Sequence, residues 1–179
     1  MKKVFLALAA CICLYGCEEA ELAMPFLVFD RAAYEEAQTS WDAQGITSYS
    51  FDITVYMNPP MDPYRITVTE GEITGLEVIG EPRWSKEKSE ENKAWVEDFI
   101  RSDLGTVPLL FAWIEKSRED AIRSLATLHK GQSIRFIVQY NKQYGYPEYM
   151  TSSISGPAEA PPPEGDGFEY TITNFKPLP

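Results

Sequence analysis

Few residues of this chain belong to the types that carry out chemistry. The chain has one histidine, His129, and three cysteines, Cys11, Cys13 and Cys17, all close to the N-terminus. Zinc sites and nucleophilic catalysis draw on clusters of histidine and cysteine, so this distribution disfavours both, and we expect neither a metal nor another cofactor. His129 is expected near the end of a helix, where the helix dipole favours its cationic form.

Acidic residues are abundant, and a pair of carboxylates can act as general acid and base. With 27 acidic residues in the chain, no pair is distinguished by its spacing, so the sequence identifies no catalytic residue.

The sequence EGDG at 164–167 faintly suggests a calcium loop. It lacks further oxygen ligands at alternate positions, and a turn is the favoured interpretation.

The N-terminus carries the clearest chemical signal. Lys2 and Lys3 precede an apolar run, Val4–Tyr15. About twelve apolar residues are too few to span a bilayer, for which ~20 are needed, so the run is typical of a cleaved export signal.

This run ends in Leu-Tyr-Gly-Cys at positions 14–17, which resembles the lipobox of bacterial lipoproteins, with Tyr15 bulkier than the residue usual there. The resemblance implies that residues 1–16 are a lipoprotein signal peptide and that Cys17 is the lipid attachment site. Acyl chains such as palmitate would then anchor the mature N-terminus, and two or more chains anchor stably. An ordinary secretory signal that happens to contain cysteine is the alternative.

Charge narrows the partners that the protein is expected to have. The formal net charge is −11, and removal of the signal with its two lysines makes it more negative. Such a surface repels phosphate backbones and anionic head groups, so we expect no nucleic-acid binding, and we expect the lipid to hold the protein at the membrane. The predicted location is the cell envelope, and Glu18 after the cysteine favours the outer membrane facing the periplasm.

A Gly-Tyr-Pro segment, 145–147, has two interpretations. The favoured one is a turn, in which Gly145 supplies a positive φ, Pro147 leads into the next strand and Tyr146 packs over the turn. The second is a recognition surface at one sheet edge, because clustered tyrosines suit binding better than catalysis. The residues of this candidate surface are Tyr140, Tyr144, Tyr146 and Tyr149.

The first part of the chain predicts a tether, a helix and three strands. Residues 17–29 are expected to be a tether, and residues 30–179 a single domain. Asp30 is placed to cap a helix that Gly45 ends, with its apolar residues at helical spacing. Alternation and turn residues then predict strands at 48–56, 64–69 and 72–79.

Residues 80–105 differ in character, because mixed charges surround a sparse apolar set. We expect a charged helical insertion that packs along one edge, with a mobile lid or docking arm as the alternative. Thr106 is placed to cap a further helix towards His129. Strands are predicted at 134–140, 148–155 and 168–172, with a Pro-rich loop at 158–167.

Four short motifs occur in a fixed order along the chain. They are Trp41, Gly45, Ile46, Tyr49 and Phe51; Ile66, Val68 and Gly71; Thr106, Val107, Leu110 and Phe111; and Val138, Tyr140, Gly145, Tyr146 and Pro147. In this arrangement the chain resembles the bacterial lipoprotein family called domain of unknown function 6174, from Trp41 to Ile172. That family has no assigned activity, so the resemblance implies no catalytic residues.

Together these patterns predict an α+β fold, in which one antiparallel sheet of about five or six strands packs against two or three helices on one face. The expected function is that of a membrane-tethered envelope lipoprotein, most consistent with a non-enzymatic module that binds an envelope protein or another envelope component. The alternative is a carboxylate-dependent, hydrolase-like or small-ligand-binding enzyme. A deep pocket with converging acids would favour the enzyme.

Overall fold

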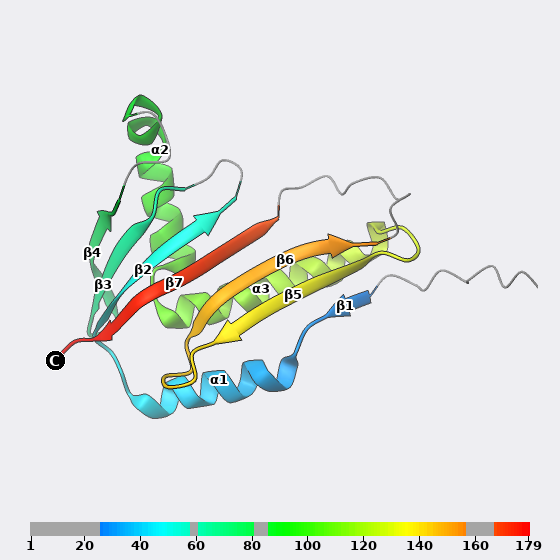
Figure 1. The fold of residues 1–179 in the computed structure, drawn as a ribbon, viewed down its shortest axis with the longest axis horizontal. Coiled ribbons are helices and arrows are strands. Elements are labelled where there is room, and N and C mark those ends of the chain that lie inside the picture. The colour runs from blue at the N-terminus through cyan, green and yellow to red at the C-terminus, as the bar shows by residue number, and fades with distance from the viewer. Residues whose placement is uncertain (1–25, 58–60, 81–85, 157–166) are drawn as a thin grey trace, which may run out of the picture.

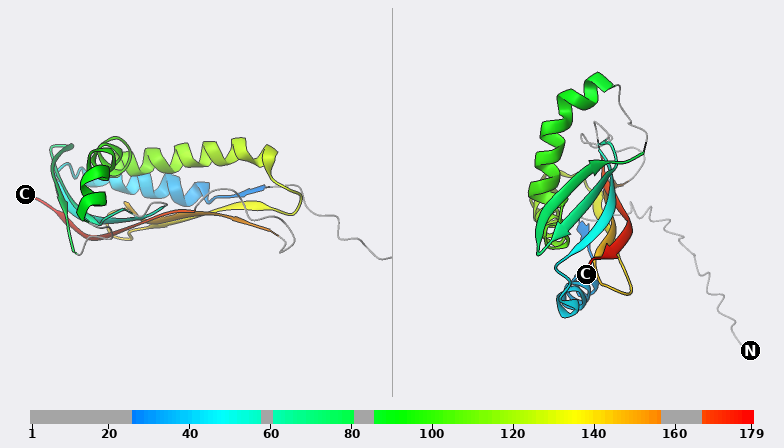
Figure 2. Two further views of the ribbon diagram at one scale, coloured as in Figure 1. Left: turned by 90° about the horizontal axis from the view of Figure 1, so that it is seen from above. Right: turned by 90° about the vertical axis from the view of Figure 1, so that its left-hand side faces the viewer.

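The central element of the structure is a sheet of seven strands in the order β1-β5-β6-β7-β2-β3-β4, with three helices on one of its faces (Figures 1 and 2). The computed structural model describes residues 26–57, 61–80, 86–156 and 167–179, which form one α+β domain. The strands are β1 (Phe26–Val28), β2 (Tyr49–Tyr56), β3 (Tyr64–Thr69), β4 (Glu72–Val78), β5 (Ser133–Tyr140), β6 (Pro147–Ser155) and β7 (Phe168–Pro177). The helices are α1 (Arg31–Gln44), α2 (Lys86–Phe99) and α3 (Val107–Ser124).

The predicted α+β class and the helices on one face are confirmed, but the description of the sheet was wrong in two respects. The sheet has seven strands, and it is mixed, because β1 runs parallel to β5 with Phe26 opposite Ser133 and Val28 opposite Arg135. The additional strand comes from residues 26–28, which the sequence assigned to the tether 17–29. The predicted signal peptide 1–16, Cys17 and most of the predicted loop 158–167 lie outside the described residues.

Side-chain caps begin α1 and α3 where the sequence predicts them. Asp30 accepts a hydrogen bond from the backbone N–H of Ala33 at 3.0 Å, and Gly45 ends α1 with a φ of 62°. Thr106 accepts from the N–H of Leu109 at 3.3 Å at the start of α3. Each cap satisfies one of the N–H groups that a helix start leaves without an intrahelical partner.

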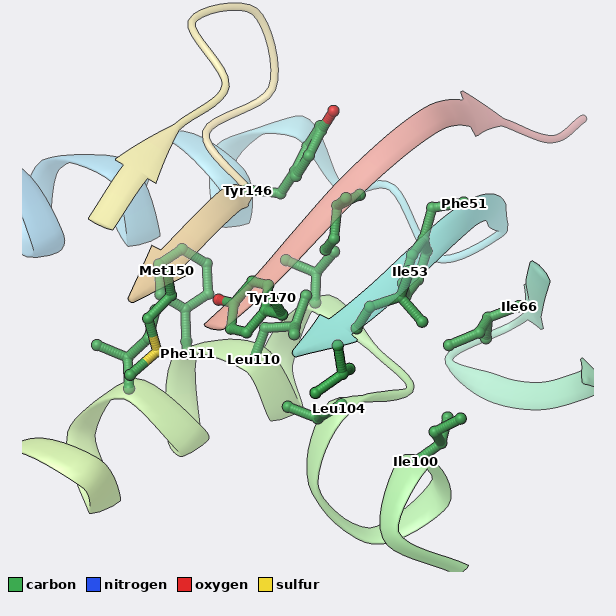
Figure 3. Close-up of a cluster of buried hydrophobic side chains, with 14 of the residues drawn as sticks. Phe51, Ile53, Ile66, Ile100, Leu104, Leu110, Phe111, Tyr146, Met150 and Tyr170 are labelled. Atoms are coloured by element: carbon green, nitrogen blue, oxygen red, sulfur yellow. The ribbon is translucent and has the colours of Figure 1, made fainter. Parts of the chain in front are cut away.

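The core lies between the sheet and the helices and follows the alternation of the strands. Phe51, Ile53 and Tyr170 point to the helix side and are almost completely buried. Figure 3 shows this cluster continuing to Leu110 of α3 and to Ile100. Because successive side chains of a strand point to opposite faces, the polar residues of the same strands lie on the other face.

The charged insertion 80–105 contains α2 and a π-helical turn, Ile100–Leu104. Val96, Ile100 and Leu104 are buried against the domain, whereas Trp95 is 47% exposed and stacks on Phe99. The described part of this segment therefore packs on the domain along one side. No helix among the described residues is long and apolar enough to cross a membrane.

Candidate functional site

One face of the sheet carries no helix. Figure 2 shows the three helices on the same side of the sheet, and no other described element covers the opposite side, which we call the open face. Its side chains alternate with buried ones, and most carry hydroxyl groups. They include Thr54, Tyr56, Thr67, Tyr149, Thr151, Ser153, Thr171 and Thr173.

On the open face an ion pair joins β2 to β3, and a hydrogen bond from an asparagine joins β7 to the same carboxylate. Arg65 donates from Nε and an Nη to the two carboxylate oxygens of Asp52, at 2.8 and 3.0 Å, and Asn174 donates to the same carboxylate at 2.7 Å. Burial raises the pKa of the Asp52 carboxyl, but the hydrogen bonds from Arg65 and Asn174 lower it by more, so the net shift is downward. A carboxylate held in this way stays ionised and is a poor general acid.

The open face is hollowed where β2, β6 and β7 meet the ends of their neighbouring loops. The hollow has a volume of about 420 Å³ and is lined by Tyr56, Met57, Thr151, Ser152, Ser153, Gly167 and Glu169. Glu169 accepts a hydrogen bond from the Tyr149 hydroxyl at 3.0 Å, and burial together with this bond raises the pKa of Tyr149.

The chemistry of this hollow is that of polar recognition. Its hydroxyl groups both donate and accept hydrogen bonds, and Tyr56 adds an aromatic ring that is 47% exposed. Glu169 is the one acid among the described residues that line the hollow. Catalysis by an acid and a base acting together would use a second carboxylate, which the described lining does not supply.

The Gly-Tyr-Pro turn has the packed conformation that the sequence favours. Gly145 has a φ of 83°, and a Cβ there would lie 2.6 Å from the carbonyl oxygen of Ala37 in α1. Tyr146 is 5% exposed, and its ring stacks on Phe175 with the centroids 4.3 Å apart. Burial, with a contribution from Glu148, raises the pKa of Tyr146 to about 12.

The four tyrosines of the candidate surface do not form one surface. Tyr140 stacks on Phe111 beneath the helices, and its hydroxyl is buried without a partner among the described residues. Burial raises its pKa. Tyr144 is half-buried against Phe175, and Tyr149 belongs to the open face.

The sequence did contain a signal for the open face. In β2 the residues Ser50, Asp52, Thr54 and Tyr56 alternate with apolar ones, which is the pattern of a half-buried strand, and β6 and β7 carry a similar alternation. What the spacing did not reveal is which strands become neighbours, because β2 pairs with β7 across more than a hundred residues.

The residues considered for metal or nucleophilic chemistry remain apart. His129 is exposed in the loop after α3, and its backbone N–H donates to Gln132. Within the described ranges no three His, Cys, Asp or Glu side chains come together in a way that suits a metal ion.

Comparison with known proteins gives a family and no further relative. Neither a curated protein nor a solved structure matches the chain. The sequence profile of the family of unknown function DUF6174 matches residues 33–177, which include every described helix and strand except β1 and the first residues of α1. The chain therefore belongs to this family of unknown function, DUF6174.

Proposed function

We propose that this protein is a lipid-anchored lipoprotein of the cell envelope that binds a partner through its open face and catalyses no reaction. The observation that carries the proposal is the uncovered, hydroxyl-rich sheet face with a shallow hollow at Tyr56, Thr151 and Glu169. Polar groups fixed on a rigid sheet are suited to recognition, because binding them immobilises little additional structure.

The anchoring part of the proposal rests on the N-terminal sequence. An acylated Cys17 would stand nine positions before Phe26, the first residue of β1. A tether of this length holds the domain close to the bilayer, and the partner is then an envelope component within reach of it. The outer membrane facing the periplasm remains the favoured location.

The enzymatic alternative has less support from the same site. The Asp52 carboxylate is hydrogen-bonded to Arg65 and Asn174, and Glu169 is the one acid among the described residues that line the hollow. Catalysis by general acid and base places two titratable groups on either side of a bound substrate. We therefore favour recognition as the role of the hollow.

Photo-crosslinking from the open face tests the binding proposal. A benzophenone side chain in place of Ser153, in the hollow, is compared with one in place of Glu119, which is exposed on α3. Irradiation of intact cells should give a discrete adduct from position 153 and none from position 119. Tyr56→Ala should abolish that adduct, because a contact residue at the centre of an interface typically contributes more than ~1 kcal/mol.

Two results would contradict binding at this face. The first is the same adduct pattern from positions 153 and 119. The second is an adduct from position 153 that persists at full yield in Tyr56→Ala, provided that circular dichroism shows the variant to be folded.

A further inference from the structure

Exposed apolar side chains gather where the described chain begins. Phe26 is 50% exposed, Val28 42% and Ile137 41%, and they are three of the seven most exposed large apolar residues of the described chain. All three belong to β1 or to its neighbour β5. We call them, with Arg135, the tether-proximal patch.

Strand pairing places these side chains on one face. Val28 lies opposite Arg135 and Phe26 opposite Ser133 in the parallel β1–β5 pair. Residues opposite each other in a sheet share a face, and so do residues two apart in a strand, so Ile137 joins Arg135 and Val28. Leu27 points to the other side and packs on the core, which leaves the patch on the open face.

The patch begins a short distance after the proposed lipid attachment site in the chain. Eight residues, 18–25, separate Cys17 from Phe26, and even fully extended they span no more than about 30 Å. If Cys17 is acylated at the bilayer surface, the patch is the part of the domain that the tether keeps nearest to the lipid. A large exposed patch of apolar residues commonly marks an interaction surface.

Charge along β5 differs from that of the whole chain. The net charge of the chain is −11, yet no acidic residue occurs between Asp120 and Glu148. This stretch includes all of β5 and carries Lys130 and Arg135, neither of which forms an ion pair within the described part of the chain. Basic side chains beside exposed apolar ones suit the head-group region of a membrane.

We infer that the tether-proximal patch rests on the bilayer, with Phe26, Val28 and Ile137 in the head-group region and Arg135 beside the phosphates. This inference rests on the proposed lipid anchor and adds an orientation to it. Ile137 lies opposite Thr151 of the hollow. Contact of the patch with the bilayer therefore holds the hollow beside the membrane surface.

A fluorescent probe at two exposed valines tests the inference. Val28→Cys places a thiol in the patch, and Val78→Cys places one on β4 at the other edge of the sheet, where Val78 is 38% exposed. Full-length acylated protein is labelled with an environment-sensitive dye and reconstituted into vesicles of phosphatidylethanolamine and phosphatidylglycerol at 3:1. The wild type serves as a control, because an acylated Cys17 takes up no dye.

The probe at position 28 should show blue-shifted emission, quenching by a nitroxide on the lipid head group and protection from aqueous iodide, whereas the probe at 78 should show none of these. Equal access of iodide to both probes on vesicle-bound protein would overturn the inference while leaving the anchor intact. Protection at position 28 in a Cys17→Ser background without vesicles, together with a dimer in analytical ultracentrifugation, would also overturn it and would assign the patch to a second copy. Failure of the anchor is recognised separately, since the wild type would then take up dye and would not sediment with vesicles.

Discussion

Two fully buried tyrosines differ in how their hydroxyl groups are satisfied. The Tyr49 hydroxyl accepts a hydrogen bond at 2.9 Å from the backbone N–H of Val107, in the first turn of α3, where no intrahelical acceptor exists. The Tyr170 hydroxyl has no partner among the described residues, and Figure 3 shows the residue within the apolar cluster. The first hydroxyl joins the sheet to a helix, whereas the second adds a polar group to the core without compensation.

Substitution of each tyrosine by phenylalanine should therefore have opposite outcomes. We expect Tyr49→Phe to lower the free energy of unfolding by about 1–2 kcal/mol, since it leaves a buried N–H unpaired. Tyr170→Phe should leave the stability unchanged or raise it by up to about 1 kcal/mol, since it removes an unpaired group. Urea unfolding of both variants measures the difference, and a larger loss for Tyr170→Phe would refute the assignment.

Asp52 gives the stability a dependence on pH whose sign follows from its shift. Its pKa in the folded protein is below that in the unfolded chain, so its stabilising effect is complete above the unfolded value, near 4, and is lost as the pH falls through the folded value. Asp52→Asn should lower the free energy of unfolding at pH 7 by about 1–3 kcal/mol. The gap between variant and wild type should begin to close as the pH falls below about 4, and a gap of equal size at pH 7 and pH 3 would contradict the ion pair's role.

The side of the sheet on which an individual tyrosine lies could not be predicted from the sequence. Tyr149 lies opposite Gln139, and a register shift then sets Tyr140 opposite Pro147. Side chains opposite each other share a face, so Tyr149 lies on the same face as Gln139. Neighbours along a strand point to opposite faces, so Tyr140 lies on the other side of the sheet. The register of the β5–β6 pair is not encoded in the spacing of tyrosines, so the sequence alone could not assign Tyr140 and Tyr149 to different faces.

At the scale of elements, long patterns and caps were predicted well and short elements poorly. The phase of β2 and the caps at Asp30 and Thr106 were all predicted from local residue types. The strand β1 was missed because its three residues are too few to show alternation. It forms through pairing with β5, which is more than a hundred residues away in the chain. No local sequence pattern predicts such a pairing.

The β5–β6 turn is held by packing of Tyr146, which leads to a stability prediction. Tyr146→Ala should lower the free energy of unfolding by about 3 kcal/mol, because a buried aromatic ring is replaced by a methyl group. Differential scanning calorimetry against the wild type measures the loss. Unchanged stability combined with loss of a binding partner would instead support the recognition surface that the sequence offered as its second interpretation.

Strands β2 and β5 contribute side chains to one core, and the cysteine positions provide no disulfide to crosslink it. Phe51 in β2 and Phe136 in β5 are buried on the helix side, and all cysteines lie at or before Cys17. Phe51→Ala or Phe136→Ala should each lower the free energy of unfolding by about 3–5 kcal/mol.

Dithiothreitol should leave the melting temperature of the wild type unchanged, and a fall would show a stabilising disulfide that the cysteine positions argue against.

At the scale of the whole molecule, we propose that a lipid anchor, a membrane-facing sheet edge and an open face act together. The acidic chain is repelled by anionic lipid on average, while its least acidic stretch includes β5 beside the start of the domain. The fold alone does not identify the partner, since one architecture serves many functions. The open face and its hollow locate where the partner is to be sought.

The most direct test of this account is the mass of the mature N-terminus, recovered from membranes in detergent. We expect a chain that begins at Cys17 and carries a diacylglyceryl group and a further acyl chain. The Cys17→Ser variant should lack this mass and leave the membrane fraction, because burial of the acyl chains provides the anchor. An unmodified N-terminus in the wild type, with the variant still retained by the membrane, would contradict the central claim.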